Sequence, residues 1–106
     1  MDIRVITPVH ISTKALLYAN NRRTGLTPPE LRQLIEEHRG ITLGSTDVDF
    51  LLVWDHHKER PTVLLVARSS MYDTLVSIWG PHYYGIPNGY PTASQIALAK
   101  ANALTS

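Results

Sequence analysis

The fold of this chain is decided by residues 48–79, which read VDFLLVWDHHKERPTVLLVARSSMYDTLVSIW. Three apolar runs lie within this stretch, at residues 48–54, 62–67 and 74–79. Runs of this length, rich in β-branched and aromatic side chains and bounded by polar residues, predict β-strands. The connections between them are short, which favours an antiparallel meander because parallel neighbours require a long crossover.

The first of these runs predicts a strand that is buried on both faces. Successive side chains of a strand point to opposite sides of the sheet. Phe50, Leu52 and Trp54 therefore share one face, and Leu51 and Val53 share the other. Because both faces are apolar, we expect a central strand that other elements or a partner cover on two sides.

The N-terminal segment predicts one strand and one helix. Residues 3–11 are rich in β-branched side chains but contain Pro8, which cannot donate a ladder hydrogen bond. We therefore expect an edge strand here, or a strand that ends near residue 7. A helix is predicted from Lys14 to Gly25, with a serine or threonine before it as the N-cap and the glycine as its stop.

The second helix has the clearest start signal in the chain. Residues 27–30, Thr-Pro-Pro-Glu, match a capping box with proline at the first helical position. One apolar face then continues toward Gly40, so residues 28–39 are predicted as a helix. The positions on this face are Leu31, Leu34, Ile35 and His38.

The remaining segments predict a connector, a loop and a last helix. Residues 41–47 contain glycine, serine and aspartate and are interpreted as a connector. Residues 80–91 contain three prolines and three glycines, which indicates a loop with defined turns. Residues 92–95, Thr-Ala-Ser-Gln, match a second capping box and predict a helix over residues 96–104. This helix is alanine-rich and carries one charge, so we expect it to pack against other parts of the protein or a partner.

Together these elements predict a single α+β domain over residues 1–106. Its order is an N-terminal β-α-α, a three-stranded antiparallel meander and a C-terminal helix. Residues 80–106 form a loop-and-helix extension of that domain. A chain of 106 residues has the length of one domain.

The composition narrows the possible functions. Charged residues make up 18% of the chain and the net charge is +1, which leaves little cationic surplus for binding nucleic acid. The low charge fraction favours self-association or a protein partner instead. The chain has no cysteine, which excludes disulfides and thiolate metal sites. No signal-peptide pattern and no apolar run of ~20 residues occurs, so we expect a soluble cytoplasmic protein without membrane contact.

Two polar or aromatic segments provide candidate binding residues. The turn after the first long strand contains His56, His57, Lys58 and Arg60, which can contact phosphate or form a solvated hairpin tip. The segment after the third strand contains Trp79, His82, Tyr83, Tyr84 and Tyr90. Such aromatic residues suit base stacking, a protein interface or simple packing of the loop on the sheet edge.

The sequence predicts no metal site and no cofactor. The chain has five histidines, and no two of them have the spacing that forms a chelating pair on a helix. His56 and His57 are adjacent, and neighbouring side chains of an extended segment point to opposite sides. They are therefore not expected to bind one ion together.

Arg68 follows the second long strand and has two interpretations. It can form an ion pair with Asp73 across the next turn, or it can be directed at a phosphate or carboxylate group of a ligand.

The element order β-α-α-β-β-β over residues 3–79 resembles that of the RelE/ParE superfamily of small bacterial toxins, including its BrnT-like branch. The resemblance implies a metal-independent ribonuclease, in which basic residues on the central strands and a C-terminal His or Tyr promote attack of a 2′-hydroxyl on the adjacent phosphate. Arg68 would hold the phosphate charge, His82 would move a proton, and Tyr83 or Tyr84 would stack a base. Under this hypothesis Arg68 and His82 converge on a common point.

Three functions therefore remain open, and we favour a small interaction or regulatory module that binds a protein partner or forms a homo-oligomer. The second is the toxin-type protein that binds or cleaves RNA. The third is a single-stranded nucleic-acid binder without chemistry. It would stack bases on Trp54, Trp79, Tyr83 and Tyr84 and contact the nucleic-acid backbone through Arg22, Arg23, Lys58 and Arg60.

Overall fold

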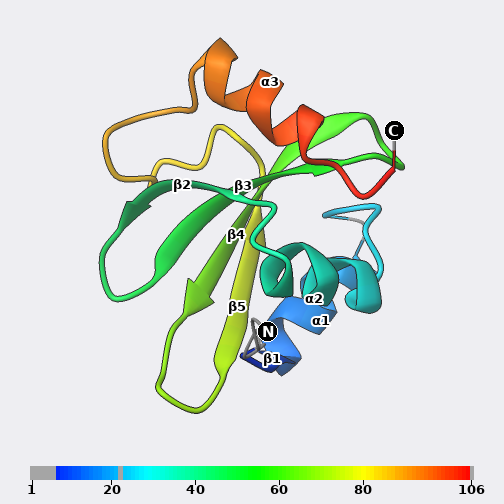
Figure 1. Ribbon diagram of the computed structural model, residues 1–106, viewed down its shortest axis with the longest axis vertical. Helices are drawn as coiled ribbons and strands as arrows, with labels where there is room; N and C mark the ends of the chain where they lie inside the picture. The colour runs from blue at the N-terminus through cyan, green and yellow to red at the C-terminus, as the bar shows by residue number, and fades with distance from the viewer. Residues whose placement is uncertain (1–6, 22, 106) are drawn as a thin grey trace, which may run out of the picture.

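The computed structural model describes residues 7–21 and 23–105 of the chain. These residues form an α+β fold, as predicted, with three helices and a mixed five-stranded sheet of order β1-β5-β4-β3-β2 (Figure 1). The elements in chain order are β1 Val9–Ile11, α1 Thr13–Asn20, α2 Pro28–Glu36, β2 Ile41–Ser45, β3 Asp49–Asp55, β4 Arg60–Ala67, β5 Asp73–Trp79 and α3 Ala93–Ala101.

The antiparallel meander is present but contains four strands, β2 to β5, so the prediction of three was wrong. The missed strand is β2, which lies within residues 41–47, the segment predicted as a connector. An edge strand tolerates glycine and serine. Among the described strands β2 pairs only with β3, with a register shift between Thr42 and Gly44. Gly44 also has a packing role, because a Cβ there would lie 2.9 Å from the Cβ of Pro87.

The opposite edge of the sheet is β1, which pairs in parallel with β5. Val9 lies opposite Asp73 and Ile11 lies opposite Leu75. The prediction of an edge strand is confirmed, and Pro8 lies just before its first residue. The alternative, a strand that ends near residue 7, falls mainly on residues 3–6, which lie outside the described residues.

All three helices begin at capping residues that the sequence indicates. The Ser12 side chain accepts a hydrogen bond from the Ala15 amide at the start of α1. Thr27 and Thr92 each form a complete capping box, at α2 and α3. Because α3 begins directly after its cap, it covers residues 93–101 rather than 96–104.

The predicted helix ends were less accurate than the starts. α1 ends at Asn20, five residues before the glycine that was expected to stop it. α2 ends at Glu36, three residues short of the predicted end, because His38 adopts a left-handed backbone with φ of 53°. The chain thus leaves α2 before it reaches Gly40.

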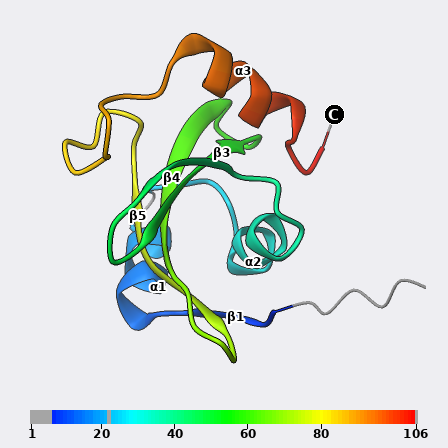
Figure 2. The same ribbon diagram turned by 60° about the vertical axis from the view of Figure 1, so that its left-hand side comes forward.

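The core lies on both faces of the sheet (Figure 2). On one face, α1 and α2 pack against Leu51 and Val53 of β3. On the other, α3 and Ile86 of the loop after β5 pack against Phe50 and Leu52. The predicted two-sided burial of this strand is therefore confirmed. In the described part of the chain, no helix has the length and apolar character needed to span a bilayer.

Candidate functional site

A buried carboxylate organises the turn that follows β3. Asp55 is fully buried at the end of that strand. Its Oδ2 accepts hydrogen bonds from the Thr24 hydroxyl at 3.0 Å and the Gly25 amide at 2.6 Å. Its Oδ1 accepts hydrogen bonds from the amides of His57 at 3.0 Å and Lys58 at 3.1 Å. Asp55 therefore joins the β3–β4 turn to the segment that leads into α2.

These hydrogen bonds decide the charge of Asp55. Burial by itself would raise the pKa of this carboxyl group, but the donors from Gly25, Lys58, Thr24 and His57 outweigh it and lower the pKa below its ordinary value. The carboxylate is consequently ionised at neutral pH and holds the turn in one conformation.

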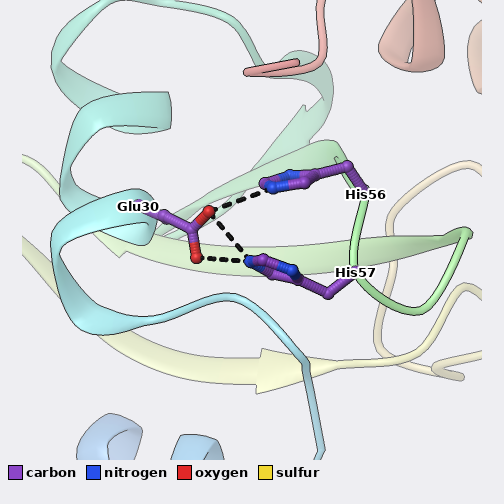
Figure 3. Close-up of side chains that lie close together, drawn as sticks. All are labelled: Glu30, His56 and His57. Atoms are coloured by element: carbon purple, nitrogen blue, oxygen red, sulfur yellow. Dashed lines mark hydrogen bonds and ion pairs between the residues drawn. The ribbon is translucent and has the colours of Figure 1, made fainter. Parts of the chain in front are cut away.

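The same arrangement brings Glu30 and the two adjacent histidines together (Figure 3). The Nε2 atom of His56 lies 3.1 Å from Glu30 Oε2, and that of His57 lies 2.9 Å from Glu30 Oε1. One ligand atom from each residue lies within 4.8 Å of the other two. We call these three residues the His–Glu cluster.

Glu30 is fixed by its place in α2. It is the third helical residue, and its Oε1 accepts hydrogen bonds from both the amide and the hydroxyl of Thr27, at 2.9 and 3.0 Å. Burial acts to raise the pKa of Glu30, but hydrogen bonds from Thr27 and His57 prevail and lower it. The side chain is therefore an anchored carboxylate beside two imidazole rings.

The expectation that His56 and His57 point apart was wrong. Their ring centroids are 4.1 Å apart and both Nε2 atoms face Glu30 (Figure 3). The two residues lie in a turn rather than in an extended strand, so the alternation of strand side chains does not apply. The third residue of the cluster, Glu30, comes from a distant part of the sequence. The one sequence feature that marked Glu30 was the capping box of α2.

The aromatic loop, residues 80–91, is packed against the sheet by its own side chains. Tyr83 stacks on Trp79 with ring centroids 4.4 Å apart and on Phe50 at 6.4 Å. Ile86 is buried in the core and holds the middle of the loop. Two of the predicted stacking residues, Trp79 and Tyr83, thus have intramolecular partners.

Other residues of the loop face solvent. Tyr84 is 89% exposed and Tyr90 is 59% exposed. The rings of His82 and Tyr90 form a T-shaped pair with centroids 5.2 Å apart. In Figures 1 and 2 the loop runs directly into α3, on which Leu98 is 51% exposed. We call the exposed side chains Tyr84, Tyr90 and Leu98 the loop–helix surface.

Two arginines line a pocket of about 350 Å³ at the base of the aromatic loop. The Arg23 guanidinium lies over the rings of Tyr18 and Trp79 and donates to the carbonyl of Ile78. Arg60 donates to the carbonyl of Arg23 at 2.8 Å. Within the described residues neither guanidinium contacts a carboxylate. Arg22, which was predicted to contact nucleic acid with them, lies outside the described residues.

Arg68 and His82 are not brought together. Arg68 donates to Asp49 and Asp73 at 2.8 Å each, which is the structural interpretation that the sequence allowed. It follows β4, whereas His82 follows β5, and the two strands are antiparallel. The two residues therefore lie beyond opposite ends of this strand pair, and the expected convergence does not occur.

Trp54 lines a different cavity, of about 480 Å³, together with His56, Glu59 and Lys100. The Lys100 ammonium lies 5.1 Å from the centroid of the Trp54 ring. α3 therefore lies beside the Trp54 ring, and the residues that line this cavity do not belong to the aromatic loop.

In comparisons with family models, curated proteins and solved structures, nothing matches this chain.

Proposed function

We propose that this domain is an interaction module that self-associates through the loop–helix surface. The observation that carries the proposal is the exposure of three large side chains in consecutive segments, Tyr84 and Tyr90 of the aromatic loop and Leu98 of α3. The Tyr84 ring contacts the ring of Tyr83, and Tyr83 packs against the core. The exposed Tyr84 side chain is therefore supported by a buried cluster. Rigid aromatic anchors of this kind dominate the binding energy of protein interfaces.

A second copy suits this surface better than a charged partner does. α3 carries one charged residue, Lys100, and its ammonium lies over Trp54. In a two-fold dimer the same patch of both copies forms the interface, so a patch that carries mostly one sign of charge repels its counterpart. A patch without charges avoids this repulsion, and its association depends little on salt.

The test is the molar mass of the purified protein by sedimentation equilibrium at low and high salt. A dimer that persists at high salt is expected. Leu98→Glu and Tyr84→Ser should each weaken dimerisation at least tenfold, because they remove apolar anchors from the interface. Met71→Ser is the matched control, since Met71 is 78% exposed in the β4–β5 turn, outside the loop–helix surface. A wild-type chain that stays monomeric at every concentration would contradict the proposal.

A single-stranded nucleic-acid binder is the second candidate, and the arginine pocket favours it. Arg23 and Arg60 lack carboxylate partners among the described residues and lie beside the aromatic loop. The same sedimentation experiment, repeated with a short mixed RNA and DNA oligonucleotide, separates the two candidates. A monomer that binds the oligonucleotide only at low salt, and loses binding in Arg60→Glu, would support this function.

A toxin-type ribonuclease has less support, since Arg68 is occupied by two aspartates far from His82.

A further inference from the structure

We infer that the His–Glu cluster is a binding site for one divalent transition-metal ion, with Zn²⁺ as the best match to its ligands. This site is independent of the self-association proposed above. It uses Glu30 Oε2 and the Nε2 atoms of His56 and His57 as ligands (Figure 3). Imidazole nitrogen and carboxylate oxygen are ligands that zinc takes in proteins, and two histidines with one glutamate form one of its three-residue sites.

The distances from Glu30 to the two histidine nitrogens are close to those between two ligands of one ion. Zinc bonds to nitrogen and oxygen are about 2.0–2.2 Å long, so tetrahedral ligand atoms lie about 3.3 Å apart. Glu30 Oε2 lies 3.1 Å from His56 Nε2 and 3.0 Å from His57 Nε2, and one ligand atom from each residue lies within 4.8 Å of the other two. The two distances to Oε2 therefore need to change by only a few tenths of an ångström, roughly, to match those between two ligands of one ion.

The backbone around the cluster is already organised. Glu30 Oε1 is fixed by the amide and hydroxyl of Thr27, which leaves Oε2 for an ion. The amide of His57 is fixed by Asp55, which also holds the segment leading into α2. Such supporting hydrogen bonds orient metal ligands and raise the affinity of a site.

A comparison of the two capping boxes shows that the capping role of Glu30 does not by itself require a carboxylate. In α3 the third helical residue is Gln95, and its amide oxygen accepts a hydrogen bond from the Thr92 amide at 2.9 Å. In α2 the equivalent residue is Glu30. An uncharged amide therefore completes a capping box in this protein, and the cap alone does not require the anion that faces two histidines.

The tautomer of His56 is compatible with an ion. Its Nδ1 is buried and has no hydrogen-bond partner within the described residues. When Nε2 binds a metal, Nδ1 carries the proton and is an unsatisfied donor, and when Nε2 carries the proton, Nδ1 is an unsatisfied acceptor. Because only three protein ligands converge, the fourth position of the ion is left to water or to a group from a ligand.

The experiment is a calorimetric titration of the full chain with Zn²⁺ alone, together with its melting temperature at rising Zn²⁺. One ion per chain and a melting temperature that rises with Zn²⁺ are expected, because an ion that binds the folded state stabilises it. Glu30→Gln keeps the capping acceptor, as Gln95 does in α3, and His57→Ala removes an exposed ligand. Each should lower the affinity at least tenfold, since even the loss of a supporting residue costs about 10–100-fold.

His10→Ala is the matched control, because His10 is exposed on β1 and lies outside the cluster. Its affinity for Zn²⁺ should equal that of the wild type. The absence of Zn²⁺ binding, or binding of wild-type affinity in the folded Glu30→Gln variant, would overturn the inference and leave an ordinary hydrogen-bonded cluster. Co²⁺ gives a second measurement on the wild-type chain: strong visible bands of a four-coordinate ion support the site, and the weak bands of hydrated Co²⁺ alone overturn it.

Discussion

The Asp55 network predicts that one buried carboxylate supplies a large part of the stability of this domain. Asp55 accepts four hydrogen bonds, from two segments that are about 30 residues apart in sequence. A hydrogen bond to a charged group contributes about 1.5–3 kcal/mol, and a buried donor left unsatisfied costs about 1–3 kcal/mol. The four contributions do not add fully, because Lys58 is exposed and water can reach its amide.

We therefore expect Asp55→Ala to lower the free energy of unfolding by about 3–5 kcal/mol. Asp55→Asn should cost less, about 2–3 kcal/mol, because it keeps one acceptor oxygen and loses the charge. The assay is urea denaturation followed by circular dichroism, with the midpoint and the slope fitted separately. Asp47→Asn, an exposed aspartate in the preceding turn, is the matched control and should change stability by less than about 0.5 kcal/mol.

The pH dependence gives a second readout of the same carboxylate. The folded-state pKa of Asp55 is lowered, so its contribution is present above the unfolded pKa of about 3.9 and is lost as pH falls through the folded pKa. Asp55→Asn does not titrate. The stability difference between wild type and Asp55→Asn should therefore shrink between about pH 6 and about pH 3. A cost below about 1 kcal/mol for Asp55→Ala, or a difference that stays constant over this range, would refute the reasoning.

Three further predictions concern packing and ion pairs, each measured as a change in the urea midpoint. Gly44→Ala should lower the free energy of unfolding by about 1–3 kcal/mol, because the new Cβ would collide with Pro87 at 2.9 Å. Gly80→Ala is the control and should lower it by under about 1 kcal/mol, since there is open space around Gly80; equal losses would contradict the packing argument. Arg68→Ala should cost about 1–2 kcal/mol, since it leaves one buried aspartate without its partner, and no change would show that both ion pairs are negligible. Ile86→Ala should cost about 2–4 kcal/mol and release the aromatic loop, seen as lost near-ultraviolet signal from the stacked rings; an intact signal would show that the loop does not depend on this anchor.

The sequence predicted local features of this fold well because their causes are local. The capping boxes at Thr27 and Thr92 need residues only three positions apart, and both are present. The three strong apolar runs are strands, since their composition and length leave few alternatives. β2 was missed because an edge strand is defined by its neighbour, and its glycine suits both a loop and an irregular edge.

The His–Glu cluster could not be predicted in the same way. His56 and His57 were visible as a pair, but their orientation depends on a turn that Asp55 holds from the side of β3. The capping box by itself explains a glutamate at position 30, so nothing in the sequence indicated that Glu30 also contacts the two histidines. A search for a third ligand requires the contact between the α2 start and the β3–β4 turn, and that contact exists only in the folded chain.

The positions of the cationic side chains, rather than their number, count against a toxin-like ribonuclease activity. A ribonuclease needs a cation and a proton-transfer group within reach of one phosphate. Arg68, the cation that the sequence assigned to this role, is held by Asp49 and Asp73 at the end of the sheet away from His82. Any contact with RNA would therefore rely on Arg23 and Arg60, which lie at the base of the aromatic loop. If oligonucleotide binding occurs, it should be lost in Arg60→Glu and be retained in Arg68→Ala, and the reverse pattern would restore the toxin-like site.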